Sequence, residues 1–226
     1  MATWDLKELR ELIADRGGKK CAEDAEPYIQ SFAGKFDLLS VHFHEARSVF
    51  PDFYNKSSPS TIDAFRAMLS TGEKRNNFSL AKLKYEAFAL GAVQTQHSVS
   101  DVLAHLLAVA MGLPESAEAH LTLPGVKKQL PDKGLKVSID KFLGLSEYRF
   151  LQDFVNINKH MRLVDARYHI STPENGEERH GVRFKSFSYS GRHHLERWGD
   201  QLFSELKKVA EAQVGIGMQL NTVLGR

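Results

Sequence analysis

The stretch Asp153-Phe-Val-Asn-Ile-Asn-Lys-His-Met-Arg162 decides how the rest of the chain is interpreted. At about 100° per residue, four apolar side chains around it share one stripe, which predicts a helix over 146–162 with one face in the core. These side chains are Phe150, Phe154, Ile157 and Met161. Asp153, Asn156 and His160 form a second stripe beside the first. Polar groups at such a boundary need hydrogen-bond partners, so chemistry is most expected here.

Helical periodicity extends over most of the chain before this stretch. It predicts a short first helix that Gly17-Gly18 ends, a helix from Pro27 to about Phe50, and a long helical tract from Phe78 to Met111. The segment between this tract and residue 138 is rich in proline and glycine, which predicts a loop.

Downstream of the 146–162 helix the pattern changes to period two. Arg167–Ile170 and Val182–Phe184 alternate, and Asn175-Gly176 lies between them. This arrangement predicts a β-hairpin at about 165–190, followed by a final helix from near Gly191. The predicted fold class is all-α: a helical bundle with long antiparallel helices and one β-hairpin inserted before the C-terminal helix.

Length and composition favour one soluble domain. The chain has 226 residues, 42% hydrophobic and 26% charged, with a formal net charge of +2. We therefore expect a single domain over 1–226, with N-terminal helices in 1–77 and core helices in 78–226. A nearly balanced charge provides no global field for nucleic acid. No secretory signal or membrane span is expected, which favours a cytoplasmic protein.

Cysteine and histidine spacing argue against a metal or another cofactor. One cysteine excludes an intramolecular disulfide and a Cys-rich zinc site. His97 and His105 lie two helical turns apart, roughly 12 Å of rise, which is too far to share one ion. We expect no metal site and no cofactor. His97 and Asp101 are interpreted either as a polar pair inside a helix contact or as a solvated pair on the helix surface.

Asn156, Lys159 and His160 form the stronger candidate group. His160 is suited to act as a general base near neutral pH, with Asn156 orienting the imidazole or a substrate. Lys159 lies further around the helix, toward solvent. The alternative interpretation is structural, with the histidine and asparagine satisfying backbone groups where helix and hairpin meet.

A basic and aromatic cluster follows in and after the predicted hairpin. Arg183, Lys185 and Arg192 alternate with aromatic side chains such as Phe184 and Tyr189. Phosphate attraction together with base stacking suits single-stranded RNA. The alternative is a hairpin whose aromatic side chains lie in the core while its charges face water.

Two motifs together resemble a known family. His97-Ser-x-x-Asp101 lies in a long helix, and Asp153-Phe-Val-Asn-x-x-Lys-His-x-Arg-Leu-Val164 leads into the hairpin. Over about 78–210 the chain resembles a branch of the HEPN superfamily of bacterial and archaeal all-helical domains. This resemblance implies a metal-independent endoribonuclease, working as a homodimer in a defence or toxin–antitoxin context, in which a histidine deprotonates a ribose 2′-OH and an arginine stabilises the phosphate.

The chain departs from the superfamily's signature, in which an arginine is usually followed by a polar residue and, after four to six positions, by a histidine. Arg162 and His169 are separated by six residues, but Leu163 follows the arginine where a polar residue is usual. Either this pair or Asn156 and His160 stands in for the motif. The first hypothesis is an RNA-directed ribonuclease that uses His160 with Asn156 and Arg162.

Two other residues, His97 and Asp101, are included in that catalytic hypothesis, and the predicted substrate-binding residues are Lys159, Arg183, Lys185 and Arg192. A non-catalytic HEPN-like adaptor with a protein partner is the alternative hypothesis. A small-molecule enzyme with a helical pocket is the third.

Overall fold

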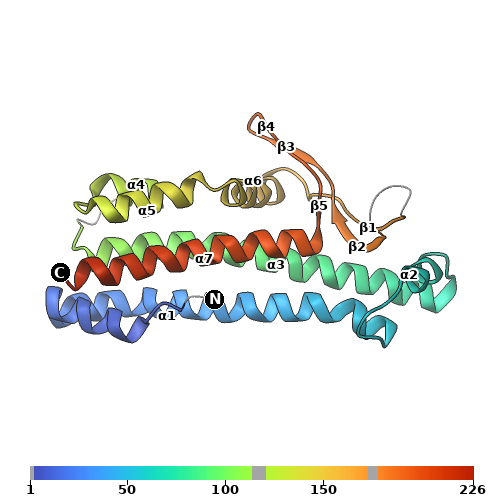
Figure 1. The fold of residues 1–226 in the computed structure, drawn as a ribbon, viewed down its shortest axis with the longest axis horizontal. Helices are drawn as coiled ribbons and strands as arrows, with labels where there is room; N and C mark the ends of the chain where they lie inside the picture. The colour runs from blue at the N-terminus through green and yellow to red at the C-terminus, as the bar shows by residue number, and fades with distance from the viewer. Residues whose placement is uncertain (1–2, 114–120, 173–177) are drawn as a thin grey trace. The chain divides into compact units, whose positions relative to one another are not determined.

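The computed structural model describes residues 3–113, 121–172 and 178–226. Figure 1 labels the elements in chain order, and long helices account for most of the described residues. The elements are α1 (Leu6–Tyr54), α2 (Thr61–Met68), α3 (Gly72–Ala110), α4 (Leu123–Gln129), α5 (Lys133–Gly144), α6 (Ser146–His160), β1 (Ala166–Ser171), β2 (Arg179–Phe184), β3 (Phe187–Tyr189), β4 (Arg192–His194), β5 (Arg197–Trp198) and α7 (Gly199–Leu224). The prediction of an all-α fold with strands before the C-terminal helix is confirmed.

The chain divides into two compact units. Unit 1 comprises Met1–Asp37, Thr95–Gln152 and Glu205–Arg226, and unit 2 comprises Leu38–Gln94 and Asp153–Ser204. The long helices α1, α3, α6 and α7 each contribute residues to both units.

Unit 1 is fixed by buried polar contacts as well as by its apolar core. The Trp4 indole Nε1 donates to Asn221 Oδ1 over 2.8 Å. The Gln213 amide donates to Ser100 Oγ over 2.9 Å, and both residues are buried. Because a buried polar group without a partner is costly, these bonds fix one register between α7 and the segments that it contacts in this unit.

An aromatic cluster forms the core of unit 2. Tyr168 of β1 packs edge-on against Phe50 of α1 and Phe78 of α3, with ring centroids 4.8 and 4.9 Å apart. Edge-to-face geometry at this distance adds to the free energy of simple area burial. The first strand is thereby held against two helices.

Short-range sequence signals set the boundaries of several helices. The Ser60 side chain caps α2 by accepting from Asp63 N. The Asp63 side chain in turn accepts from the Ser60 backbone N–H, which completes a capping box. Asp132 caps α5 in a similar manner, with its side chain accepting from Leu135 N. Within α1 the backbone leaves helical geometry at Gly18 (φ 74°), a conformation that glycine adopts without steric cost.

The strands form two separate sheets. β2 pairs antiparallel with β1 and with β5, with Ala166 opposite Phe184 at one end of the β1–β2 ladder. β3 and β4 form a two-stranded sheet, and Ser190 and Gly191 between them both have positive φ (48° and 77°). Positive φ at both central residues is the mark of a tight hairpin turn.

This turn corrects the predicted start of the final helix. Gly191 ends a hairpin turn, residues 192–194 are a strand, and α7 begins at Gly199. The single predicted hairpin is instead a three-stranded sheet plus a separate pair of strands, because β5 returns to pair with β2. The predicted Asn175-Gly176 turn lies outside the described residues.

Three other predictions of local structure were wrong. α3 begins at Gly72 rather than Phe78. The segment before residue 138 was predicted to be a loop, but it contains α4 and the beginning of α5. The side chains of Thr122 and Asp132 cap the N-termini of these two helices. Met161 was expected in the core with Phe154, but it is 70% exposed because α6 ends at His160.

Candidate functional site

The end of α6 is fixed by an asparagine cap within unit 2. Asn158 Nδ2 donates to Phe154 O over 2.6 Å, and Asn158 Oδ1 accepts from Val164 N over 3.0 Å. The backbone N–H groups of Met161 and Arg162 both donate to Ile157 O, each over 3.0 Å. These bonds satisfy backbone groups that a helix terminus leaves unpaired, so the chain turns sharply here on a well-defined backbone.

Three polar side chains extend from this fixed turn into solvent. Lys159, His160 and Arg162 are exposed, and within the described ranges their side chains make no hydrogen bond or ion pair. Asn156, one helical turn before His160, is half-buried. The structure therefore keeps an imidazole and two cations together on one short segment, with the histidine open to a ligand.

A buried carboxylate one turn before Asn156 attaches the β3–β4 sheet to α6. Asp153 is fully buried, and its two oxygens accept from Arg192 Nε and Nη2 over 2.7 and 2.6 Å. His194 Nε2 lies 2.7 Å from Asp153 Oδ2. Bidentate pairing of this kind fixes both distance and orientation. Arg192 was predicted to bind substrate, but its guanidinium is paired with the Asp153 carboxylate.

The sequence indicated Asp153 only as a member of the polar stripe. Its partners Arg192 and His194 come about forty residues later, after three strands, and helical spacing carries no information about such contacts. Phe154, the next residue, packs edge-on against Phe184 and Phe187, with both centroid distances 5.7 Å. The ion pair and the aromatic contacts together position the hairpin.

The pKa of Asp153 lies below its ordinary value of 3.8. Burial by itself raises the pKa, but the hydrogen bonds and charges of Arg192 and His194 outweigh burial. Asp153 is therefore ionised in the folded chain, where its carboxylate binds a proton less tightly than in the unfolded chain.

Acidification is expected to remove stability through this carboxylate. Because the folded pKa of Asp153 is depressed, its contribution is complete above the unfolded value of 3.8 and is lost as the pH falls through the folded value. Urea denaturation from pH 7 down to about pH 3 measures this loss. The free energy of unfolding should fall less steeply with decreasing pH in Asp153→Asn than in the unmodified chain. An equally steep fall in both would contradict the assignment.

The other predicted basic residues lie beside acidic partners. Arg183 forms an ion pair with Glu196, and Lys185 Nζ lies 3.2 Å from Asp165 Oδ2. The Arg183 guanidinium also lies over the Trp198 ring, 5.4 Å from its centroid. Because each of these cations is matched by a carboxylate, the strands present less positive charge than the sequence indicates.

His169 lies on the exposed side of β1, whereas its neighbour Tyr168 is buried. The His169 ring packs edge-on against the Trp198 ring, with ring centroids 5.6 Å apart. His97 and Asp101 belong to α3 in unit 1, where His97 is half-buried and Asp101 is exposed. Asn156, His160 and Arg162 belong to unit 2, so α6 and its turn bring together only this part of the predicted catalytic set.

Among the described residues, no group of three or more His, Cys, Asp or Glu side chains is arranged to hold a metal ion. Within residues 3–113, 121–172 and 178–226, no helix has both the length and the apolar character needed to cross a membrane.

The fold defines the class of this protein as a helical bundle with two small sheets before its last helix. Comparison with protein-family models, with curated proteins and with solved structures gave no match. The side chains themselves therefore carry the evidence for function.

Proposed function

We propose that this chain is a HEPN-like, RNA-directed protein and that the segment Lys159–Arg162 contacts RNA. The observation that carries the proposal is the exposed imidazole of His160 between two cations with no carboxylate partner among the described residues. Lys159 and Arg162 attract phosphate, while the Asn158 cap holds the backbone beneath them. Preorganised charge of this kind is what a phosphodiester substrate requires.

The proposed reaction is a metal-independent transesterification. His160 accepts the proton of a ribose 2′-OH, and the 2′ oxygen attacks the adjacent phosphorus. The bond to the 5′ oxygen breaks, and that oxygen takes a proton from water. The products are a 2′,3′-cyclic phosphate and a 5′-hydroxyl end. Arg162 stabilises the charge on the phosphate, and Asn156 restricts the imidazole from one turn away.

Roles for His97 and Asp101 in unit 1, and for a homodimer, remain predictions of the family resemblance. So do the defence or toxin–antitoxin context and the cytoplasmic location. None of them is needed for the single-site reaction at His160.

A specific observation favours the alternative, a non-catalytic adaptor. Met161 and Leu163 are 70% and 68% exposed in the same turn as His160 and Arg162. Two large apolar side chains beside exposed cations suit a protein partner as well as RNA bases. The adaptor would use the same surface for binding without proton transfer.

Cleavage in EDTA tests the ribonuclease proposal. The full chain is expected to cut a mixed-sequence RNA in EDTA and to leave the same sequence uncut when every ribose is 2′-O-methylated. Methylation removes the proton that His160 must accept, so the chemistry stops while phosphate and base contacts remain. Gel analysis of both substrates, with end-group analysis of the products, measures the result.

Either of two outcomes would overturn the ribonuclease proposal. The first is cleavage of the methylated strand, which requires a different nucleophile. The second is the absence of cleavage of either strand, which leaves the adaptor function as the conclusion for this surface.

A further inference from the structure

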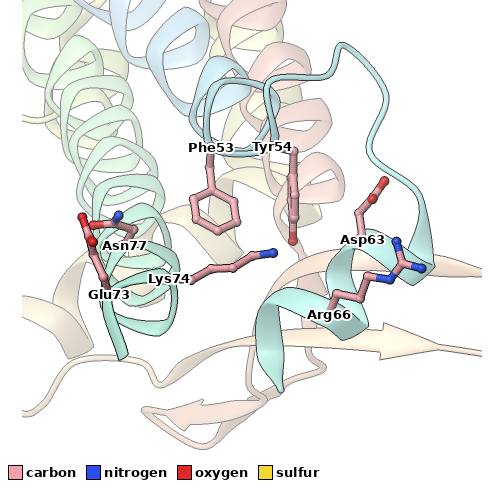
Figure 2. A pocket seen from close by; sticks show the side chains of 7 residues that line it. All are labelled: Phe53, Tyr54, Asp63, Arg66, Glu73, Lys74 and Asn77. Atoms are coloured by element: carbon pink, nitrogen blue, oxygen red, sulfur yellow. The ribbon is translucent and has the colours of Figure 1, made fainter. Parts of the chain in front are cut away.

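A hollow in unit 2 shares no residue with the Lys159–Arg162 segment. It has a volume of about 450 Å³, within the range of ligand pockets. The end of α1, the helix α2 and the first turns of α3 form its walls, as Figure 2 shows. Its lining residues are Phe53, Tyr54, Asp63, Arg66, Glu73, Lys74 and Asn77.

Two cations in this hollow are available to a ligand. Arg66 and Lys74 are exposed and have no hydrogen bond or ion pair to the described residues. In Figure 2, Lys74 extends from α3 toward the Tyr54 hydroxyl, and the Arg66 guanidinium lies on the opposite side of Tyr54, beside Asp63. The Glu73 carboxylate lies near Asn77 at the side of the opening. Although Asp63 and Glu73 also line the hollow, the charged group that points at the Tyr54 hydroxyl is the Lys74 ammonium.

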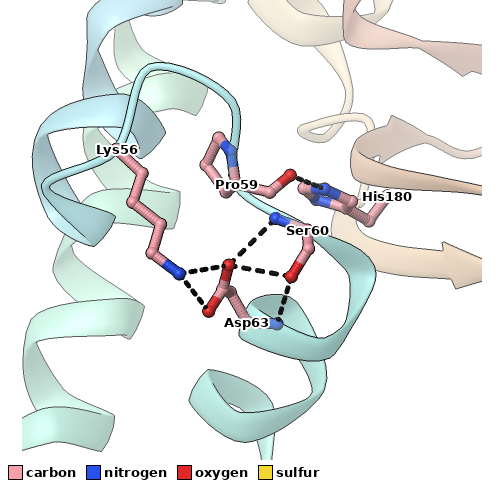
Figure 3. A network of polar contacts seen from close by, with 5 residues as sticks. All are labelled: Lys56, Pro59, Ser60, Asp63 and His180. Atoms are coloured by element: carbon pink, nitrogen blue, oxygen red, sulfur yellow. Dashed lines mark hydrogen bonds and ion pairs between the residues drawn. The ribbon is translucent and has the colours of Figure 1, made fainter.

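The nearby carboxylate of Asp63 is already engaged. Both of its oxygens lie 2.8 Å from Lys56 Nζ, and Oδ2 also accepts from the Ser60 backbone and hydroxyl at 3.0 and 2.8 Å (Figure 3). The Lys56 ammonium and the Ser60 donors hold the pKa of Asp63 well below its usual range. Its charge is compensated by Lys56, so Arg66 and Lys74 keep theirs for a ligand.

A hydrogen-bond chain leaves the Tyr54 hydroxyl able to donate. His180 Nε2 lies 2.9 Å from the Pro59 carbonyl oxygen, which only accepts, so Nε2 carries a proton (Figure 3). In the neutral ring Nδ1 then accepts from Tyr168 over 2.7 Å. The Tyr168 oxygen is left to accept from Tyr54, but that distance is 3.5 Å. A hydrogen bond of this length is weak. Little free energy is therefore lost when the Tyr54 hydroxyl donates to a ligand instead of to Tyr168.

Aromatic side chains form one wall beside these donors. Phe53 packs edge-on against Tyr54 with ring centroids 4.7 Å apart and lies 5.6 Å from Phe78. Phe53 is half-buried and lines the hollow, so its ring presents a fixed apolar surface. A flat apolar group can pack there while an attached anion reaches the cations.

We infer that this hollow binds a phosphate monoester that carries a flat apolar group. A dianionic phosphate matches the two charges of Arg66 and Lys74, and the Tyr54 hydroxyl donates to one of its oxygens. The flat group packs on Phe53. This site stands whether or not His160 cleaves RNA, since the two surfaces have no residue in common.

Calorimetric titration of the full chain tests this inference. The probes are phenyl phosphate, inorganic phosphate and 5′-AMP, the last to find whether the flat group extends to a purine. Phenyl phosphate is expected to bind about tenfold more tightly than inorganic phosphate, because only phenyl phosphate reaches Phe53. Lys74→Gln, Arg66→Gln and Tyr54→Phe should each weaken phenyl phosphate about tenfold.

The matched control is Lys128→Gln, an exposed lysine of α4 in unit 1 with the same change of charge. It should bind phenyl phosphate as the unmodified chain does. No binding of phenyl phosphate at millimolar concentration would overturn the inference. The inference would also be overturned if the three pocket variants bound phenyl phosphate as tightly as the unmodified chain does. It would likewise be overturned if the unmodified chain bound inorganic phosphate as tightly as phenyl phosphate.

Discussion

Arg192→Gln is expected to lower the free energy of unfolding by more than Asp153→Asn, although the two residues form one ion pair. Asp153 is completely buried, whereas half of the Arg192 side chain is exposed. Removing the arginine leaves a buried carboxylate with His194 as its remaining described partner, and an uncompensated buried charge is costly. Removing the carboxylate charge leaves an arginine that water can reach.

Equilibrium urea denaturation of the full chain measures this asymmetry. Asp153→Asn should cost about 1–2 kcal/mol, the usual range for losing charge-assisted hydrogen bonds at a site that keeps a polar group of the same shape. The Asp153→Asn/Arg192→Gln double variant should be more stable than Arg192→Gln alone, because it no longer buries an unpaired charge.

The matched control for this pair is Arg167→Gln on β1. Arg167 pairs with Asp165 across 3.0 Å, but both side chains are well exposed, so the change should stay within about 0.5 kcal/mol. An Arg192→Gln variant as stable as Arg167→Gln would show that the buried pair does not hold the hairpin. The same conclusion would follow if the two single changes were additive in the double variant.

Helical periodicity predicted the helices well because it depends on neighbours three and four residues away. Phe154 and Ile157 are 1% exposed, as their stripe requires. Met161 continues the same stripe but lies outside the helix, since the Asn158 side chain closes the last turn. A cap of this kind was not distinguished in the sequence from an ordinary polar residue.

Contacts between distant segments account for most of what the sequence did not indicate. The hairpin turn at Ser190-Gly191 could be read as a helix start because Gly191 precedes a helically spaced run. The pairing of β4 with β3, of β5 with β2 and of Arg192 with Asp153 shows that the chain is still extended there. Pairings of this range depend on tertiary structure, and spacing cannot report them.

The candidate site divides in the same way. His160 and Arg162 were predicted from local order, and the structure leaves both exposed on one turn. Tyr54, Arg66 and Lys74 come from three different helices, and no motif connects them. A hollow assembled from such separate segments becomes visible only when the chain is folded.

His160→Ala is expected to slow RNA cleavage in EDTA by about 10²–10⁴-fold while leaving RNA affinity nearly unchanged. Loss of a general base removes proton transfer in the transition state but little of the phosphate attraction, which comes from Lys159 and Arg162. His160 is exposed at a helix end, so the variant should fold normally. Single-turnover cleavage rates and binding to 2′-O-methyl RNA measure the two effects separately.

The comparison variants for this prediction are His44→Ala and His169→Ala. His44 is exposed on α1 outside the proposed site, so its variant should cut RNA at the unmodified rate. His169→Ala tests the alternative in which Arg162 and His169 form the motif, and its rate should fall little if His160 is the base. A loss in His169→Ala with full activity in His160→Ala would move the catalytic role to β1. Equal cleavage by all three variants would show that His160 is dispensable and is not the base, so the activity would come from another protein in the preparation or from another part of the chain.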